Sequence, residues 1–80
     1  MQKYFTHARS GDSYATDEEG ELFASLEDAR KSAVTGVRQL IADQLLSGAS
    51  RIEINVFIDD DAGERQATIP INVVATGLDA

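Results

Sequence analysis

The sequence contains no cysteine and no tryptophan, and it has a single proline and a single histidine. Without cysteine the chain forms no disulfide bond and offers no thiolate ligand to zinc. Small secreted domains usually depend on disulfides, so we expect a protein of the reducing cytoplasm. The sequence also lacks a run of about 18 apolar residues. Its first residues lack the apolar stretch of a signal peptide, so we expect no membrane-spanning segment and no secretion.

Positive charge is scarce as well. Seven lysine and arginine residues stand against 14 aspartate and glutamate residues, which gives a net charge of −7. Binding to nucleic acid or to an anionic membrane depends on clustered cations, so we expect neither kind of partner. Many of the acids fall in two stretches that we expect to be surface loops, able to meet a basic protein partner. These acids are Asp17, Glu18, Glu19 and Glu21 in the first loop, and Asp59, Asp60, Asp61 and Glu64 in the second.

The length of 80 residues leaves room for one domain, which we place at residues 1–75, followed by a flexible tail at 76–80. A chain of this size buries only about 60% of the surface that its unfolded form exposes. Much of its apolar content is alanine, which fills little volume, so the core should be thin. Thin cores often gain stability from self-association, and we therefore expect a homodimer.

The clearest element is a helix expected over residues 26–47. Ser25 and Asp28 have the spacing of a capping box at its start, and Gly48 is placed to end it. Apolar residues recur every three or four positions between these ends and form one stripe. Gly36 lies inside the helix, where glycine costs about 1 kcal/mol relative to alanine. A tolerated compromise, close packing against a neighbour and a functional kink are the three interpretations of this glycine.

Strands are predicted on both sides of the helix by alternating apolar and polar residues and by turn sequences between them. An aliphatic row in the third strand should face the helix, while Pro70 in the fourth strand places it at a sheet edge or in a bulge. The expected fold is a two-layer α+β domain of order β-β-α-β-β, with the helix on one face of a three- or four-stranded, mainly antiparallel sheet. The four predicted strands cover residues 3–8, 13–16, 51–59 and 65–74.

The second face of this sheet is expected to carry aromatic side chains. Phe57 alternates with the aliphatic row, and either Tyr4 or Phe5 joins it, because both sides of the first strand carry an aromatic residue. Clustered exposed apolar groups often mark a surface that a partner covers. The candidate interaction surface adds the histidine, the first acidic loop and the edge proline, and consists of Tyr4, Phe5, His7, Asp17, Glu18, Glu19, Phe57 and Pro70.

His7 is the one histidine available as a general base at neutral pH. It lies in a predicted strand, and the sequence has no nucleophile elbow, phosphate-binding loop or dinucleotide-binding glycine motif. The run Asp59-Asp60-Asp61 lacks the glycine and glutamate positions of a calcium-binding EF-hand loop. We therefore expect no catalytic residue, no metal and no cofactor. A small metal-binding protein or enzyme centred on His7 is kept as an alternative.

Several short motifs follow one another along the chain: Tyr4-Phe5-Thr6-His7, Asp17-Glu18-Glu19-Gly20, Leu26-Glu27-Asp28-Ala29-Arg30, and the hairpin Asp60-Asp61-Ala62-Gly63-Glu64 followed by Ala67-Thr68-Ile69-Pro70. Their order resembles a family of short uncharacterised bacterial proteins that share a domain of unknown function. The resemblance implies a bacterial, cytoplasmic, single-domain protein and transfers no activity. Such proteins often have proline or aspartate just before the helix leucine, where this chain has Ala24-Ser25.

A fainter likeness, in layout only and limited to residues 3–46, is to the HicB-type antitoxin domain. The predicted function is a non-enzymatic protein-interaction or regulatory module that acts as a homodimer. The HicB likeness implies an alternative, an antitoxin-like module that masks a basic partner.

Overall fold

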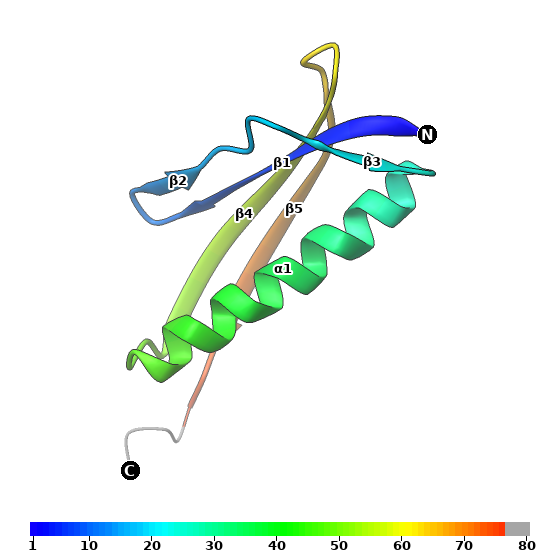
Figure 1. Ribbon diagram of the computed structural model, residues 1–80. Coiled ribbons are helices and arrows are strands. Elements are labelled where there is room, and N and C mark those ends of the chain that lie inside the picture. The colour runs from blue at the N-terminus through cyan, green and yellow to red at the C-terminus, as the bar shows by residue number, and fades with distance from the viewer. Residues whose placement is uncertain (77–80) are drawn as a thin grey trace.

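The computed structural model describes residues 1–76, and its helix and five strands form a two-layer α+β domain (Figure 1). This is the predicted class and order, with one strand more than expected. The predicted tail at 76–80 lies outside the described residues, except for Thr76. The elements are β1 (Gln2–Ser10), β2 (Ser13–Ala15), β3 (Glu21–Phe23), α1 (Leu26–Leu46), β4 (Arg51–Asp60) and β5 (Arg65–Val74).

The sheet is antiparallel throughout, with strand order β2-β1-β4-β5. The additional strand, β3, pairs with β1 along the same edge as β2 but at the opposite end, where Tyr4 lies across from Glu21. Its three residues are too few for an alternating pattern, and we expected Glu21 to belong to an acidic surface loop. Pairing with β1 makes this segment a strand, because the neighbouring backbone offers hydrogen bonds that the sequence alone does not reveal.

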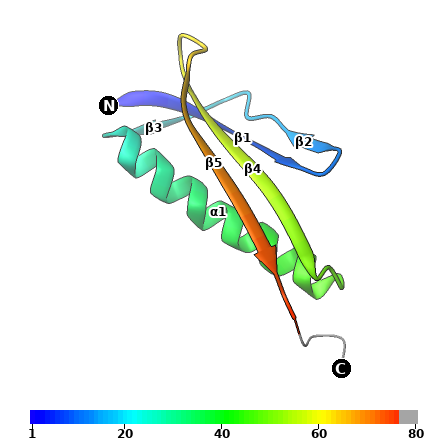
Figure 2. The same cartoon turned by 180° about the vertical axis from the view of Figure 1, so that it is seen from behind.

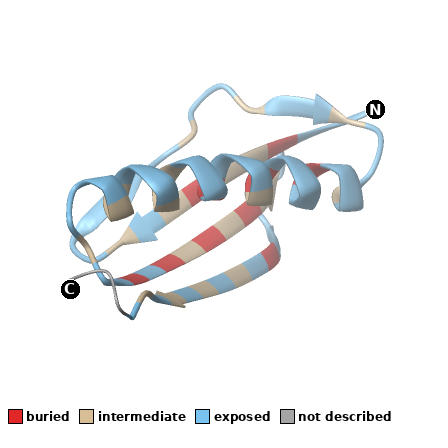
Figure 3. Ribbon diagram, turned by 90° about the horizontal axis from the view of Figure 1, so that it is seen from below, coloured by how far each residue is buried: buried red, intermediate tan, exposed pale blue. Residues whose placement is uncertain are grey.

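The core is built on β4. Ile52, Ile54, Val56 and Ile58 alternate along this strand, face the helix as predicted and are almost wholly buried (Figure 3). The helix meets them with three small buried side chains, Ala29, Ala33 and Val37. Small residues let the helix axis approach the sheet closely, so a thin layer of side chains still excludes water. The predicted aliphatic row is confirmed as the centre of the fold.

The helix ends follow the sequence signals. The backbone N–H of Asp28 donates to Ser25 Oγ at 3.2 Å, which satisfies one of the free N–H groups of the first turn. Gly48 has a φ of 100° after the C-terminus, a conformation that side-chain-bearing residues rarely adopt. The helix runs unbroken through Gly36. Outside its own helical turn and chain neighbours, no atom of residues 1–76 lies within 4 Å of a methyl group built at Gly36, so close packing does not explain this glycine.

Pro70 lies in β5, which is an edge strand. It pairs with Asn55, and the register runs without interruption on both sides of this pair. The irregularity in the ladder falls between Ile58 and Asp59 instead. Of the two alternatives for Pro70, the edge position is therefore confirmed. A proline paired in this way has its nitrogen on the side away from its neighbour, where it removes no bond from the sheet.

The central position of Ile54 gives a test of this core. Ile54 is 0% exposed, so Ile54→Ala should lower the free energy of unfolding by about 2–5 kcal/mol through lost burial and a residual cavity. Chemical denaturation followed by circular dichroism measures this loss. Leu46→Ala, at a helical residue that is 87% exposed, is the control and should change stability by about 0.5 kcal/mol or less. Equal effects of the two variants would contradict the assigned core.

Candidate interaction surface

The orientation of β1 decides which predicted surface residues are accessible. Tyr4 faces the helix, is 7% exposed and packs beside Phe23, with ring centroids 6.3 Å apart. It belongs to the core and is not part of an accessible surface. Phe5 and His7 lie on the opposite side of the sheet, which we call the open face because no described element covers it (Figure 2). The sequence left Tyr4 and Phe5 as alternatives, and the structure selects Phe5.

Three rings form a stack on the open face. His7 lies directly across from Phe57 in the β1–β4 ladder, and Tyr14 of β2 lies beside both. The Tyr14 centroid is 6.3 Å from each of the other two, with interplanar angles of 20° to His7 and 25° to Phe57. Ring pairs at this separation contribute about 0.5–1.5 kcal/mol beyond their buried area. The stack therefore ties the short strand β2 to the centre of the sheet.

Cationic side chains lie over the aromatic rings of this face. The guanidinium carbon of Arg65 is 4.3 Å from the centroid of Phe57, and that of Arg9 is 5.9 Å from Tyr14. Lys3 Nζ lies 6.0 Å from the ring of Phe5. Such cations are attracted to the ring faces, while their aliphatic stems shield apolar surface from water. The rings of the open face are thus partly shielded by the protein's own cationic side chains.

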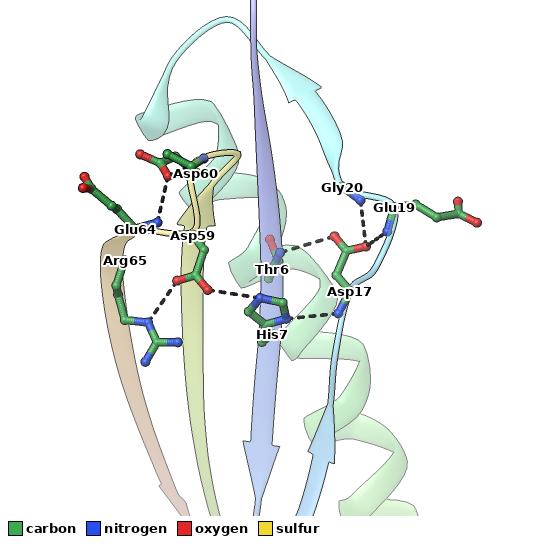
Figure 4. A network of polar contacts seen from close by, with 10 residues as sticks. Thr6, His7, Asp17, Glu19, Gly20, Asp59, Asp60, Glu64 and Arg65 are labelled. Atoms are coloured by element: carbon green, nitrogen blue, oxygen red, sulfur yellow. Dashed lines mark hydrogen bonds and ion pairs between the residues drawn. The ribbon is translucent and has the colours of Figure 1, made fainter.

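Both ring nitrogens of His7 are engaged (Figure 4). Nδ1 accepts a hydrogen bond from the backbone N–H of Asp17 at 3.1 Å, and Nε2 lies 3.3 Å from Asp59 Oδ2. This geometry fits a neutral imidazole with its proton on Nε2. Asp59 also accepts from Arg65 Nε at 3.0 Å, and this bond raises the pKa of the Arg65 guanidinium. His7 is therefore a structural link between the first acidic loop and the β4–β5 hairpin.

The carboxylate of Asp17 closes the gap that β2 and β3 leave along β1. Its Oδ2 accepts from the backbone N–H of Thr6 at 3.3 Å, while Oδ1 accepts from Glu19 at 3.1 Å and Gly20 at 3.0 Å. These hydrogen bonds favour the charged form, the one from Gly20 most strongly, and hold the pKa of Asp17 below its usual value. Gly20 has a φ of 72°, and an added methyl group would lie 2.8 Å from the Phe5 ring. Asp17 is therefore a structural staple of its own loop.

Two further acids of the first loop lie at the surface. Glu18 and Glu19 are exposed, and their loop lies at the same end of the sheet as the β4–β5 turn, because Tyr4 pairs with Glu21 on one side and Asp60 on the other. Asp60 organises that turn by accepting from the backbone N–H groups of Ala62 and Glu64. A basic partner for these loops stays a prediction.

The flank of the sheet along β5 is covered much less well. The helix packs mainly over β4 and β1, so the aliphatic side chains on the helix side of β5 remain half-buried. We call these residues, Ile69, Ile71 and Val73, the β5 strip. At Ile69 the strip adjoins a hollow of about 340 Å³ whose lining includes Val34 and the cations Arg30, Lys31 and Arg38. Pro70 lies on the same strand but faces the open side.

A family model described as a domain of unknown function, DUF6894, matches residues 3–72. The chain belongs to this family. The predicted resemblance to an uncharacterised domain family is thereby confirmed, and the family description assigns no activity to any residue of this DUF6894 member. No curated protein and no solved structure matches the chain. Within residues 1–76, no helix is both long enough and apolar enough to cross a membrane.

The sequence analysis did not predict three features: the position of Tyr14 in the ring stack, the hydrogen bonds of the Asp17 carboxylate, and the β5 strip. The first two have a recognisable signal in the sequence. The Gly11-Asp12 turn sets the register that places Tyr14 across from Arg9. An aspartate three residues before a glycine, as in Asp17 and Gly20, is typical of a turn in which the carboxylate binds the following N–H groups. The β5 strip had no signal, because the alternation in β5 does not reveal how far across the sheet the helix reaches.

The staple predicts a specific dependence of stability on pH. Because the pKa of Asp17 is lower in the folded state than the unfolded value of about 3.9, its contribution is present above that value. It is lost as the pH falls through the folded pKa. Asp17→Asn should therefore lower the melting temperature at pH 7 and flatten its fall between about pH 5 and pH 2.

Thermal unfolding followed by circular dichroism across this range measures both effects. Glu18→Gln is the matched control, because Glu18 lies beside Asp17 and is exposed. If both variants showed the same acid profile as the original chain, the stapling role of Asp17 would be wrong.

Proposed function

We propose that the protein is a non-enzymatic interaction module that acts as a homodimer, joined along β5. The observation that carries the proposal is a ten-residue edge strand bordered by half-buried aliphatic side chains. At about 3.3 Å per residue, β5 offers an edge of about 33 Å. Within residues 1–76, no strand pairs with its outer side. Long apolar edges of this kind readily pair with another strand.

A second copy of the chain fits this edge because β5 complements itself. Two β5 strands in antiparallel pairing, related by a two-fold axis perpendicular to the sheet, place their helices on the same face. The β5 strips of the two copies, Ile69, Ile71 and Val73 of each, then lie next to each other beneath two helices instead of at the margin of one. Burying these half-exposed side chains contributes about 25 cal/mol for each Å² of apolar surface removed from water.

The other features of the sheet favour a closed dimer over further growth. The opposite edge is already occupied by β2 and β3, and the Asp17 carboxylate binds the N–H of Thr6 between them. An interface in which the same patch meets itself ends at two copies. Pro70 removes one N–H from the free edge, which limits the pairing to a few hydrogen bonds and makes the apolar strip necessary.

The engagement of both ring nitrogens of the single histidine supports the non-enzymatic part of the proposal. His7 is 9% exposed, and its two nitrogens bind Asp17 and Asp59. A general base must reach the proton that it abstracts, and this imidazole has no nitrogen directed at an open site. The side chain most suited to general-base chemistry at neutral pH serves the fold instead.

The edge geometry provides a sharp test at Asn72. This residue has the same register parity as Pro70, so its N–H points to the free edge, and Asn72→Pro removes no bond from the monomer. Each copy of the dimer would lose one hydrogen bond of about 1 kcal/mol, so the dissociation constant should rise about 30-fold. Asn72→Ala keeps the N–H and should leave the constant unchanged. Pro70→Val restores an N–H and should tighten the dimer.

Sedimentation velocity over a range of concentrations measures these constants. The original chain should sediment at about twice its mass of 8.6 kDa. A strict monomer at micromolar concentration would overturn the homodimer. A dimer that responds to neither Asn72→Pro nor Pro70→Val would show that the copies meet elsewhere, and the β5 interface would then be wrong.

A further inference from the structure

The opposite flank of the helix, away from β5, contains a hollow of about 250 Å³ that borders the core and lies outside the proposed dimer interface. It lies between α1 and the part of β1 that β2 and β3 leave unpaired. Ala33, Val37 and Leu40 of α1 and Ala8 and Val56 of the sheet give it apolar walls. Its volume is just below the roughly 300 Å³ at which pockets for drug-sized ligands begin, so an occupant must be small.

Gly36 is one of the residues that line this pocket, and it adds no side chain to the wall. A methyl group at this position would meet no atom within 4 Å outside its own helical turn, among the described residues. Glycine weakens a helix interior, and neither close packing nor a positive φ requires it here. The lining of the pocket therefore receives only backbone from this position.

The polar part of the lining is acidic. Asp17 and Glu21 contribute carboxylates, and Thr6 and Ser32 contribute hydroxyl groups. No lysine or arginine is among the described residues that line the pocket. Asp17 is held ionised by its three backbone hydrogen bonds, and Glu21 is exposed at the rim. Apolar walls with negative charge at one side are complementary to a molecule with an apolar body and a positive end.

We propose that this pocket binds a small amphipathic cation, namely an aliphatic primary amine. Its hydrocarbon chain lies along Val37 and Leu40, and its ammonium group lies against the carboxylates of Asp17 and Glu21. The site does not include β5, so a test of ligand binding does not depend on whether the protein forms the proposed dimer.

The test uses three ligands with the same six-carbon chain: hexylammonium, 1-hexanol and hexanoate. Each is titrated at pH 7 into the isotopically labelled chain, and backbone amide shifts are followed by NMR. Hexylammonium should cause saturable shifts at Ala8, Gly36 and Val37 and bind at least tenfold more tightly than 1-hexanol. Hexanoate should not bind. Equal binding of all three, or hexylammonium shifts that do not saturate or lie elsewhere, would overturn the proposal.

Variants of the lining test the apolar contact and the charge interaction separately. Gly36→Leu should fill the pocket and abolish binding of hexylammonium, while Gly36→Ala should retain it and raise the melting temperature. Glu21→Gln should weaken hexylammonium several-fold without changing 1-hexanol, and Glu18→Gln, outside the pocket, is the matched control. Unchanged hexylammonium binding in Gly36→Leu would place the ligand elsewhere and refute the site.

Discussion

A single helix has to cover a sheet that is wider than itself, and the rest of the structure follows from this mismatch. A helix with its side chains is about 10–12 Å across, whereas strands in the order β2-β1-β4-β5 at about 4.8 Å spacing span more than this. The helix covers the middle, so the aliphatic row of β4 is wholly buried while β5 is not. The uncovered areas are the two flanks of the helix and the open face. These three areas differ in the residues that cover or border them.

The open face shows how an acidic protein uses its few cations. Four of the seven basic residues, Lys3, Arg9, Arg51 and Arg65, alternate onto this face, and three of them lie over aromatic rings. The acids are instead concentrated in the loops at one end. Although the net charge is −7, the acidic and basic residues are therefore distributed differently, and the cations of the open face shield aromatic rings from water. The β5 strip, in contrast, is half-buried and borders a free strand edge.

The sequence was sufficient for those features that depend on local periodicity or on a single conformational requirement. The row from Ile52 to Ile58 and the cap at Ser25 are of this kind, and Pro70 limited its strand to a sheet edge or a bulge, of which the structure has the edge. Features that depend on distance across the sheet could not be predicted. β3 becomes a strand only through β1, Asp17 finds Thr6 across a gap, and Tyr4 rather than Phe5 is buried because of where the helix lies. The candidate surface mixed core and surface residues for this reason.

The same mismatch connects the two proposals on either side of the helix. Toward β5, the uncovered side chains are aliphatic and continuous with a free strand edge, so a surface that brings its own strand and helix completes the layer. Toward β1, the edge is already closed by β2, β3 and the Asp17 carboxylate, so no strand can enter. The space left there is small, its lining is mainly apolar with the acidic residues Asp17 and Glu21, and Gly36 adds no side chain to it. Backbone pairing therefore suits one flank and a small cation the other, because the two flanks differ in whether a strand edge is free.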